Sequence, residues 1–106
     1  MSGIEIGSGN VYADLGMSNA TDMLVKAQLA NKIGEIVRLR KLTQARAAEL
    51  LGIPQPKLSN MLRGQFRGIS ETKMIDCLTR LGRDVEIVVR ETDAAKSAGH
   101  VSVVFA

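Results

Sequence analysis

Polar side chains that can pair with nucleic-acid bases are gathered in one short segment after Pro54. They are Gln55, Lys57, Ser59, Asn60 and Arg63. Glutamine and asparagine can each form two hydrogen bonds with adenine, lysine and arginine can reach guanine or phosphate, and serine tolerates several bases. No acidic residue lies between Glu49 and Glu71, so nothing in this stretch repels a polyanion. The segment is therefore a candidate base-reading surface, with Gln55, Lys57, Ser59 and Asn60 as the base contacts.

The charge of the chain is concentrated around the same segment. Residues 38–67 carry seven basic residues and one acid, whereas residues 1–37 and 68–106 are each slightly acidic, within a net charge of +3. A basic middle between acidic ends favours a polyanionic partner, although a solvated basic face is the alternative. The expected phosphate contacts, not all of them simultaneous, are Arg38, Arg40, Lys41, Gln44, Arg46, Arg63 and Arg67.

Two short helices must position the base-reading side chains. Thr43 can cap a helix over Gln44–Leu51, and Gly52 can end it in the left-handed conformation. Pro54 and Pro56 suit the start of a second helix that ends near Arg63. Two helices joined by a tight glycine-containing turn form the helix-turn-helix pattern, whose second helix enters the major groove of DNA.

Further helical patterns flank this pair. Asn19 and Asp22 suit the start of a long helix that reaches about Lys41, and Ser70 suits the start of another that closes at Gly82. A brief helical turn is expected around residues 65–68. The apolar stripe of the long helix is Leu29, Ile33, Ile36 and Val37. We therefore predict an all-α bundle of about five helices over residues 19–82, preceded by an irregular arm over residues 1–18.

The hydrophobic period changes to two after Gly82. Val85, Ile87 and Val89 alternate with their neighbours, which predicts a strand over 85–90, and a second short strand is expected over 101–105. A lone strand leaves its backbone groups unpaired, and pairing with the same strand of a second copy would satisfy them. We therefore predict that residues 83–106 form a β appendage that makes a homodimer through Val85, Ile87 and Val89. An intrachain hairpin is the alternative.

Composition argues against other classes of function. The 106 residues suffice for one domain, and one cysteine with one histidine leaves no disulfide framework and no expected metal site or cofactor. No nucleophile motif surrounds any serine, so neither enzymatic activity nor a small-molecule substrate is expected. No apolar run suits a membrane helix and the first residues lack a secretory pattern, so we expect a cytoplasmic protein.

The helix-turn-helix segment resembles the Xre/Cro/C1 type, and most closely the HigA-type antitoxins of toxin–antitoxin operons. The residues that carry the resemblance run from Leu42-Thr43-Gln44-Ala45 through Ala47-Ala48-Glu49-Leu50-Leu51-Gly52-Ile53 and Gln55-Pro56-Lys57-Leu58-Ser59 to Leu62 and Gly64. It extends to Asn10-Val11-Tyr12-Ala13-Asp14-Leu15-Gly16 and to Leu81-Gly82-Arg83-Asp84-Val85-Glu86-Ile87-Val88-Val89. The likeness thus covers about residues 10–90.

The resemblance implies a lambda-repressor-like bundle and a homodimer that represses its own operator and binds a HigB-like ribonuclease toxin. It places Gln44 near the DNA backbone and the segment from Gln55 to Asn60 in the groove. Two positions depart from the family pattern: Arg46 stands where an acid is common, and Pro54 where a hydroxyl cap is frequent. A stand-alone regulator without a toxin, and a protein-interaction module built on the same fold, are the alternatives.

Overall fold

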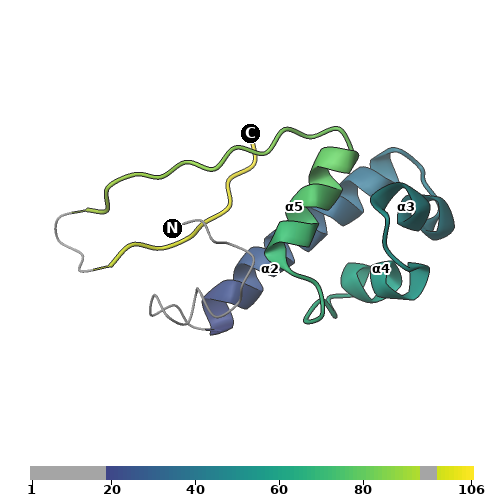
Figure 1. Ribbon diagram of the computed structural model, residues 1–106, viewed down its shortest axis with the longest axis horizontal. Coiled ribbons are helices and arrows are strands. Elements are labelled where there is room, and N and C mark those ends of the chain that lie inside the picture. Colours follow the sequence, from purple (N-terminus) through teal and green to yellow (C-terminus); the bar gives the residue numbers. More distant parts are fainter. Residues whose placement is uncertain (1–18, 94–97) are drawn as a thin grey trace.

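The computed structural model describes residues 19–93 and 98–106, and this part of the chain contains four helices. They are α2 (Asn19–Leu39), α3 (Gln44–Leu51), α4 (Gln55–Leu62) and α5 (Glu71–Arg80). The two longer helices, α2 and α5, pack on one another, and the shorter pair α3 and α4 lies together at one end of them (Figure 1). Beyond α5 the chain continues as an extended segment, here called the C-terminal extension (residues 83–93 and 98–106).

One hydrophobic core joins all four helices. The predicted stripe of α2 is buried, with Ile33 and Ile36 almost fully enclosed. Leu51 of α3, Leu58 of α4 and Met74 of α5 meet in the same cluster, each with no exposed surface. Burying a side chain of this size stabilises the folded state by about 1.5–3 kcal/mol relative to leaving it in water. The core therefore holds α3 and α4 at a fixed position on the longer helices.

The predicted starts of α3 and α5 are confirmed. The side-chain oxygen of Thr43 accepts a hydrogen bond from the backbone N–H of Arg46 at 3.1 Å, and Ser70 accepts from the backbone N–H of Lys73 at the same distance. These bonds satisfy donors in the first turn that have no partner within the helix. The long helix α2 begins at Asn19 itself, so that residue is helical and does not precede the helix.

Each helix ends in the same way, with one residue in the left-handed conformation and a backbone bond that spans six residues. In α2 the N–H of Leu42 reaches the carbonyl of Val37 at 3.0 Å, and Lys41 takes φ +55°. This geometry is the Schellman closure, which stops the helix at Leu39, two residues before the predicted end. The left-handed residues after the other helices are Gly52, Gly64 and Gly82.

The predicted fifth helix and C-terminal strands are wrong. Residues 65–66 have no regular structure and residues 67–68 form a turn, and in the described part of the extension no residue is in a strand. The alternating pattern of Val85, Ile87 and Val89 correctly indicates extended backbone, but a strand also needs a neighbouring ladder of hydrogen bonds. Within the described residues of the extension, 83–93 make no such ladder with 98–106, so neither a strand nor an intrachain hairpin is present there.

The extension nevertheless returns to the helices. Val103 packs against the core cluster, and the Phe105 ring lies 4.7 Å from the Lys32 ammonium on α2. That distance suits a cation–π contact. The predicted arm over residues 1–18 lies outside the described residues. No helix of the described chain is both long enough and apolar enough to cross a lipid bilayer.

Candidate nucleic-acid interface

The turn between α3 and α4 is held in a sharp bend at Gly52. Its φ is +70°, and its N–H donates to the carbonyl of Ala48 at 2.9 Å. A side chain at this position would be strained by the left-handed backbone and would lie 3.2 Å from the Arg80 guanidinium. Buried Ala47 lets the two helices approach closely. The predicted helix-turn-helix is therefore present, with α4 as its second helix.

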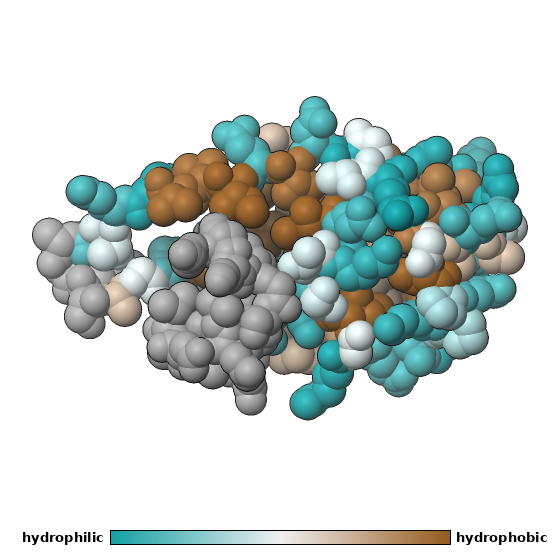
Figure 2. All heavy atoms as spheres, in the orientation of Figure 1, coloured by the Kyte–Doolittle hydropathy of each residue, from teal (hydrophilic) through white to brown (hydrophobic). Residues whose placement is uncertain are grey.

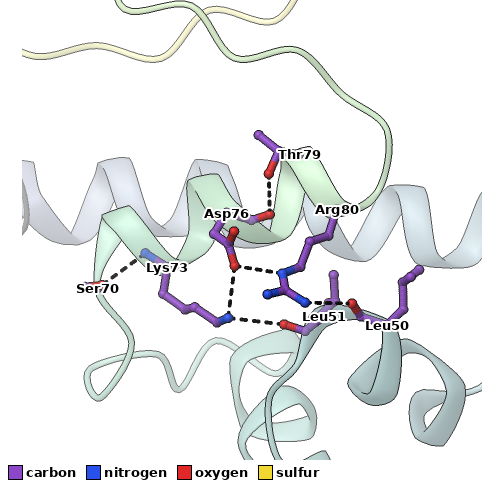
Figure 3. Close-up of polar contacts among 7 residues, drawn as sticks. All are labelled: Leu50, Leu51, Ser70, Lys73, Asp76, Thr79 and Arg80. Carbon is purple, nitrogen blue, oxygen red and sulfur yellow. Dashed lines mark hydrogen bonds and ion pairs between the residues drawn. The ribbon is translucent and has the colours of Figure 1, made fainter.

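Two cationic side chains of α5 clamp the end of α3 (Figure 3). Lys73 donates to the carbonyl of Leu51 at 3.2 Å, and Arg80 donates to the carbonyl of Leu50 at 3.4 Å. Asp76 joins the two cations, at 3.0 Å from Lys73 and 2.9 Å from Arg80. Cations stabilise the carbonyl end of a helix, and here they also tie the bend to the core. The hydrogen bonds from these cations lower the pKa of Asp76 below its usual value.

This clamp was not predicted from the sequence. Lys73, Asp76 and Arg80 follow one another at helical spacing, which indicates that they share one face of α5. The sequence gives no sign that this face meets the carbonyl groups of α3, because the two contacts join residues 22 and 30 positions apart.

The start of α4 depends on its two prolines. Pro54 precedes the helix without a side-chain cap, and its carbonyl accepts from the N–H groups of Lys57 and Leu58 at 3.0 Å. Pro56 lies in the first turn, where its missing N–H costs nothing. The departure from a hydroxyl cap therefore does not stop the helix from beginning at Gln55.

The predicted base contacts lie on one exposed side of α4. Gln55 and Lys57 are exposed and Ser59 and Asn60 are half-buried. On the opposite side, Leu58 and Met61 are buried in the core. The structure thus places all four predicted residues at the surface of a single helix.

Arg63 lies against two of those residues. One terminal nitrogen of its guanidinium donates to the Ser59 hydroxyl at 3.0 Å, and the other donates to Asn60 Oδ1 at 2.6 Å. The sequence-based prediction assigned Arg63 to phosphate, apart from the base contacts, whereas the structure joins it to two of them.

The remaining predicted phosphate contacts lie on α2, on α3 and in the loops next to the helix-turn-helix. Arg38, Arg40 and Lys41 lie in the last turn of α2 and the bend after it, and all are exposed. Gln44 is exposed at the start of α3, and Arg67 is exposed in the loop between α4 and α5. Arg46 is paired with Glu49 at 2.6 Å, and both side chains are about 70% exposed. Because such a pair contributes little, Glu49 offers weak competition for Arg46.

The predicted dimerisation residues lie in the extension. Val85 is 39% exposed, Ile87 58% and Val89 84%, with Val88 between them at 62%. Figure 2 shows apolar side chains gathered along this part of the molecule, whereas polar side chains dominate over α3 and α4.

The burial of an acidic residue, Glu71, was also not predicted from the sequence. Glu71 at the start of α5 is only 6% exposed, near Asp22 of α2 and the largely buried Lys26. Burial, and after it the neighbouring Asp22 carboxyl, raise the pKa of Glu71 to about 7, against the opposing effects of a backbone hydrogen bond and of Lys26. Asp22 was predicted only as a helix-start residue, and no role was predicted for Glu71. Among the described side chains, no group of three or more His, Cys, Asp or Glu could hold a metal ion.

Comparisons with known proteins agree with this architecture. The family model described as a helix-turn-helix domain matches residues 11–90. A solved structure described as an XRE-family transcriptional regulator has a TM-score of 0.78 and 35% sequence identity, with 84% of this chain and 100% of that chain covered. A comparison with curated proteins finds no match. Together they support a DNA-binding regulator of the Xre type and confirm that part of the resemblance. The chain belongs to the helix-turn-helix domain family.

Proposed function

We propose that this protein is a sequence-specific transcriptional regulator that reads operator DNA with α4. The observation that carries the proposal is the outer side of α4, where Gln55, Lys57, Ser59 and Asn60 stand at the surface of a helix that the core and the α5 clamp fix in place. Groups of these types match the pattern of donors and acceptors in the major groove. No acid interrupts the segment from residue 50 to 70.

Phosphate contacts supply the affinity. Arg40, Lys41 and Gln44 lie before α3 or at its start, and Arg67 lies beyond α4, so these groups can hold the backbone on either side of a groove occupied by α4. Arg46 joins them when it leaves Glu49 for a phosphate, which costs little because the pair is exposed. Neutralising several phosphates makes the affinity fall steeply with salt.

A homodimer completes the reading of an operator. One helix of eight residues contacts only a few base pairs, so useful specificity requires two copies. The exposed apolar side chains of Val85, Ile87 and Val89 are the surface on which a second copy would lie. Covering them removes apolar area from water in both copies at once, because a twofold interface uses the same patch twice.

The finer proposal is that the protein is the antitoxin and autorepressor of a toxin–antitoxin operon, with a HigB-like ribonuclease as its partner. The resemblance to HigA-type antitoxins over residues 10–90 supports it. Co-purification of the tagged full chain with the products of its neighbouring genes tests the partner. A small basic ribonuclease in the complex supports the antitoxin role, and its absence leaves a regulator without a toxin.

DNA binding is tested by the salt dependence of affinity for the DNA upstream of the gene. We expect the logarithm of the association constant to fall linearly with the logarithm of salt, and Lys57→Ala to weaken specific binding by about 5- to 150-fold. Arg90→Ala is the matched control, because it removes one exposed cation from the extension. Affinity that does not respond to salt, or equal losses in both variants, would refute reading by α4.

A further inference from the structure

We propose that Ser59, Asn60 and Arg63 act as one base-reading unit in which Arg63 contacts a guanine and Asn60 orients it. The assignment rests on the proposed function and names which residue determines specificity within it. It replaces two separate roles, an adenine-reading Asn60 and a phosphate-contacting Arg63.

The first argument is the state of the Asn60 amide. To pair with adenine through two hydrogen bonds, its Oδ1 must accept from the base amino group while its Nδ2 donates to the ring nitrogen. That oxygen already accepts a charge-assisted bond from Arg63 at 2.6 Å. A second donor, the amino group of adenine, would have to share that oxygen and would lie close to the positively charged guanidinium. Asn60 is therefore poorly prepared to read adenine.

The second argument is the geometry of Arg63. Its guanidinium has five N–H donors in a rigid fork, and the bonds to Ser59 and Asn60 occupy one on each terminal nitrogen. Three donors remain beyond these two bonds, and two donors suffice for the O6 and N7 acceptors of guanine. A fork that is already oriented loses less conformational freedom on binding than a free arginine does.

Arg63 also lies at the right place to reach the same groove as α4. Ser59 and Asn60 are on the outer side of α4, and Arg63 follows its last residue, Leu62, so the two bonds direct the arginine back along the helix. Arg67 lies four residues further along the chain. Among the hydrogen bonds of the described residues, none joins its side chain to α4. Arg67 thus serves as a phosphate contact in the same proposal.

The experiment begins with the full chain and selection of bound sequences from a random duplex library. Affinities of the wild type, Arg63→Ala, Asn60→Ala, the double variant and Arg67→Ala are then measured on the selected duplex and on each of its single-base variants, at several salt concentrations. Circular dichroism confirms that each variant is folded; Arg63 is exposed and Asn60 half-buried.

We expect Arg63→Ala to lose about 5- to 150-fold in affinity for the selected duplex and to lose its preference for one G·C pair in each half-site. Asn60→Ala should relax the same base pair, and the double variant should be no worse than Arg63→Ala alone. Arg67→Ala should weaken all duplexes alike and reduce the salt slope by about one.

Two results would overturn the unit while leaving the proposed function intact. One is an Arg63→Ala variant that behaves as Arg67→Ala does, with a uniform loss and a smaller salt slope. The other is relaxation of different base pairs by Asn60→Ala and Arg63→Ala. A library selection that enriches no sequence refutes sequence-specific binding itself, and the assignment of Arg63 fails with it.

Discussion

The helical body (residues 19–82) and the C-terminal extension both carry many apolar residues, but the body buries most of them and the extension exposes most of them. In the body, Ile33, Leu51 and Leu58 have no exposed surface. In the extension, Val89 is 84% exposed and Val104 82%. The body therefore buries most of its apolar side chains and bonds its helical backbone within one chain. The extension leaves its apolar side chains exposed, apart from the partly buried Val103, and its backbone without a ladder.

This difference separates two uses of hydrophobic residues. A side chain that is buried among neighbours from other helices stabilises the folded body directly. A side chain that stays exposed on an extended segment contributes little to the isolated chain, and a contiguous group of such side chains marks a surface for a partner. The three changes that follow test the distinction, and they are ordered by their expected effect on the stability of the body.

The largest effect is expected from Leu58→Ala. It should lower the free energy of unfolding by about 2–5 kcal/mol, because it removes buried atoms and leaves a cavity where α4 meets the core. Val104→Ala, the control in the extension, should change it by less than about 0.5 kcal/mol. Urea denaturation followed by circular dichroism measures both. Similar losses in the two variants would show that the extension is as tightly packed as the body.

A smaller effect, dependent on pH, is expected from Glu71→Gln. The folded pKa of about 7 lies above the ordinary value of 4.5, so the folded state binds more protons than the unfolded state between these values. The stability of the wild type should therefore fall as pH rises from about 4.5 to about 7. The variant should lack this fall and exceed the wild type at pH 8 by up to about 3 kcal/mol.

Glu86→Gln is the control for this change, because Glu86 is exposed in the extension. It should keep the pH dependence of the wild type. Unfolding curves at half-unit steps from pH 4.5 to pH 8 decide the matter, and a wild-type stability that rises over that range would contradict the buried-carboxyl account.

The smallest effect on the body, and the largest on assembly, is expected from the double substitution Ile87→Glu and Val89→Glu. The stability of the monomeric body should change by less than about 0.5 kcal/mol. The dimer should be lost, because each apolar side chain covered at an interface contributes about 1.5–3 kcal/mol and two charges would then be buried in each copy. Light scattering with size-exclusion chromatography measures the mass.

Thr92→Glu is the control for assembly, because it adds a charge to the extension without removing an apolar side chain. It should remain dimeric. A double variant that still forms a dimer would show that the second copy lies elsewhere.

Local signals predicted the body well. Thr43 and Ser70 as helix caps, Gly52 at the bend, and the buried stripe of α2 depend on interactions within a few residues, and the structure has all of them. The end of α2 was missed by two residues, because Lys41 adopts a left-handed conformation that a sequence normally signals with glycine. The family match over residues 11–90 confirms the helix-turn-helix.

Caps, glycines and periodicity do not predict contacts between residues that are far apart in the chain. The bonds from Lys73 and Arg80 to the end of α3 and the burial of Glu71 near Asp22 require side-chain positions that no periodicity specifies. The strand prediction failed for a related reason. A period of two specifies which way side chains alternate, but a strand exists only when another segment lies beside it to bond its backbone.

The sequence alone thus determined the starts of α3 and α5, the bend at Gly52, which sides are apolar, and where amides and cations gather, because propensities, caps and periodicity act over one or two turns of chain. Only the tertiary structure decided which polar groups meet, which acid is buried and whether the extended segment finds a neighbour. Those outcomes depend on how the elements pack in space, and packing brings together residues that the order of the chain keeps apart.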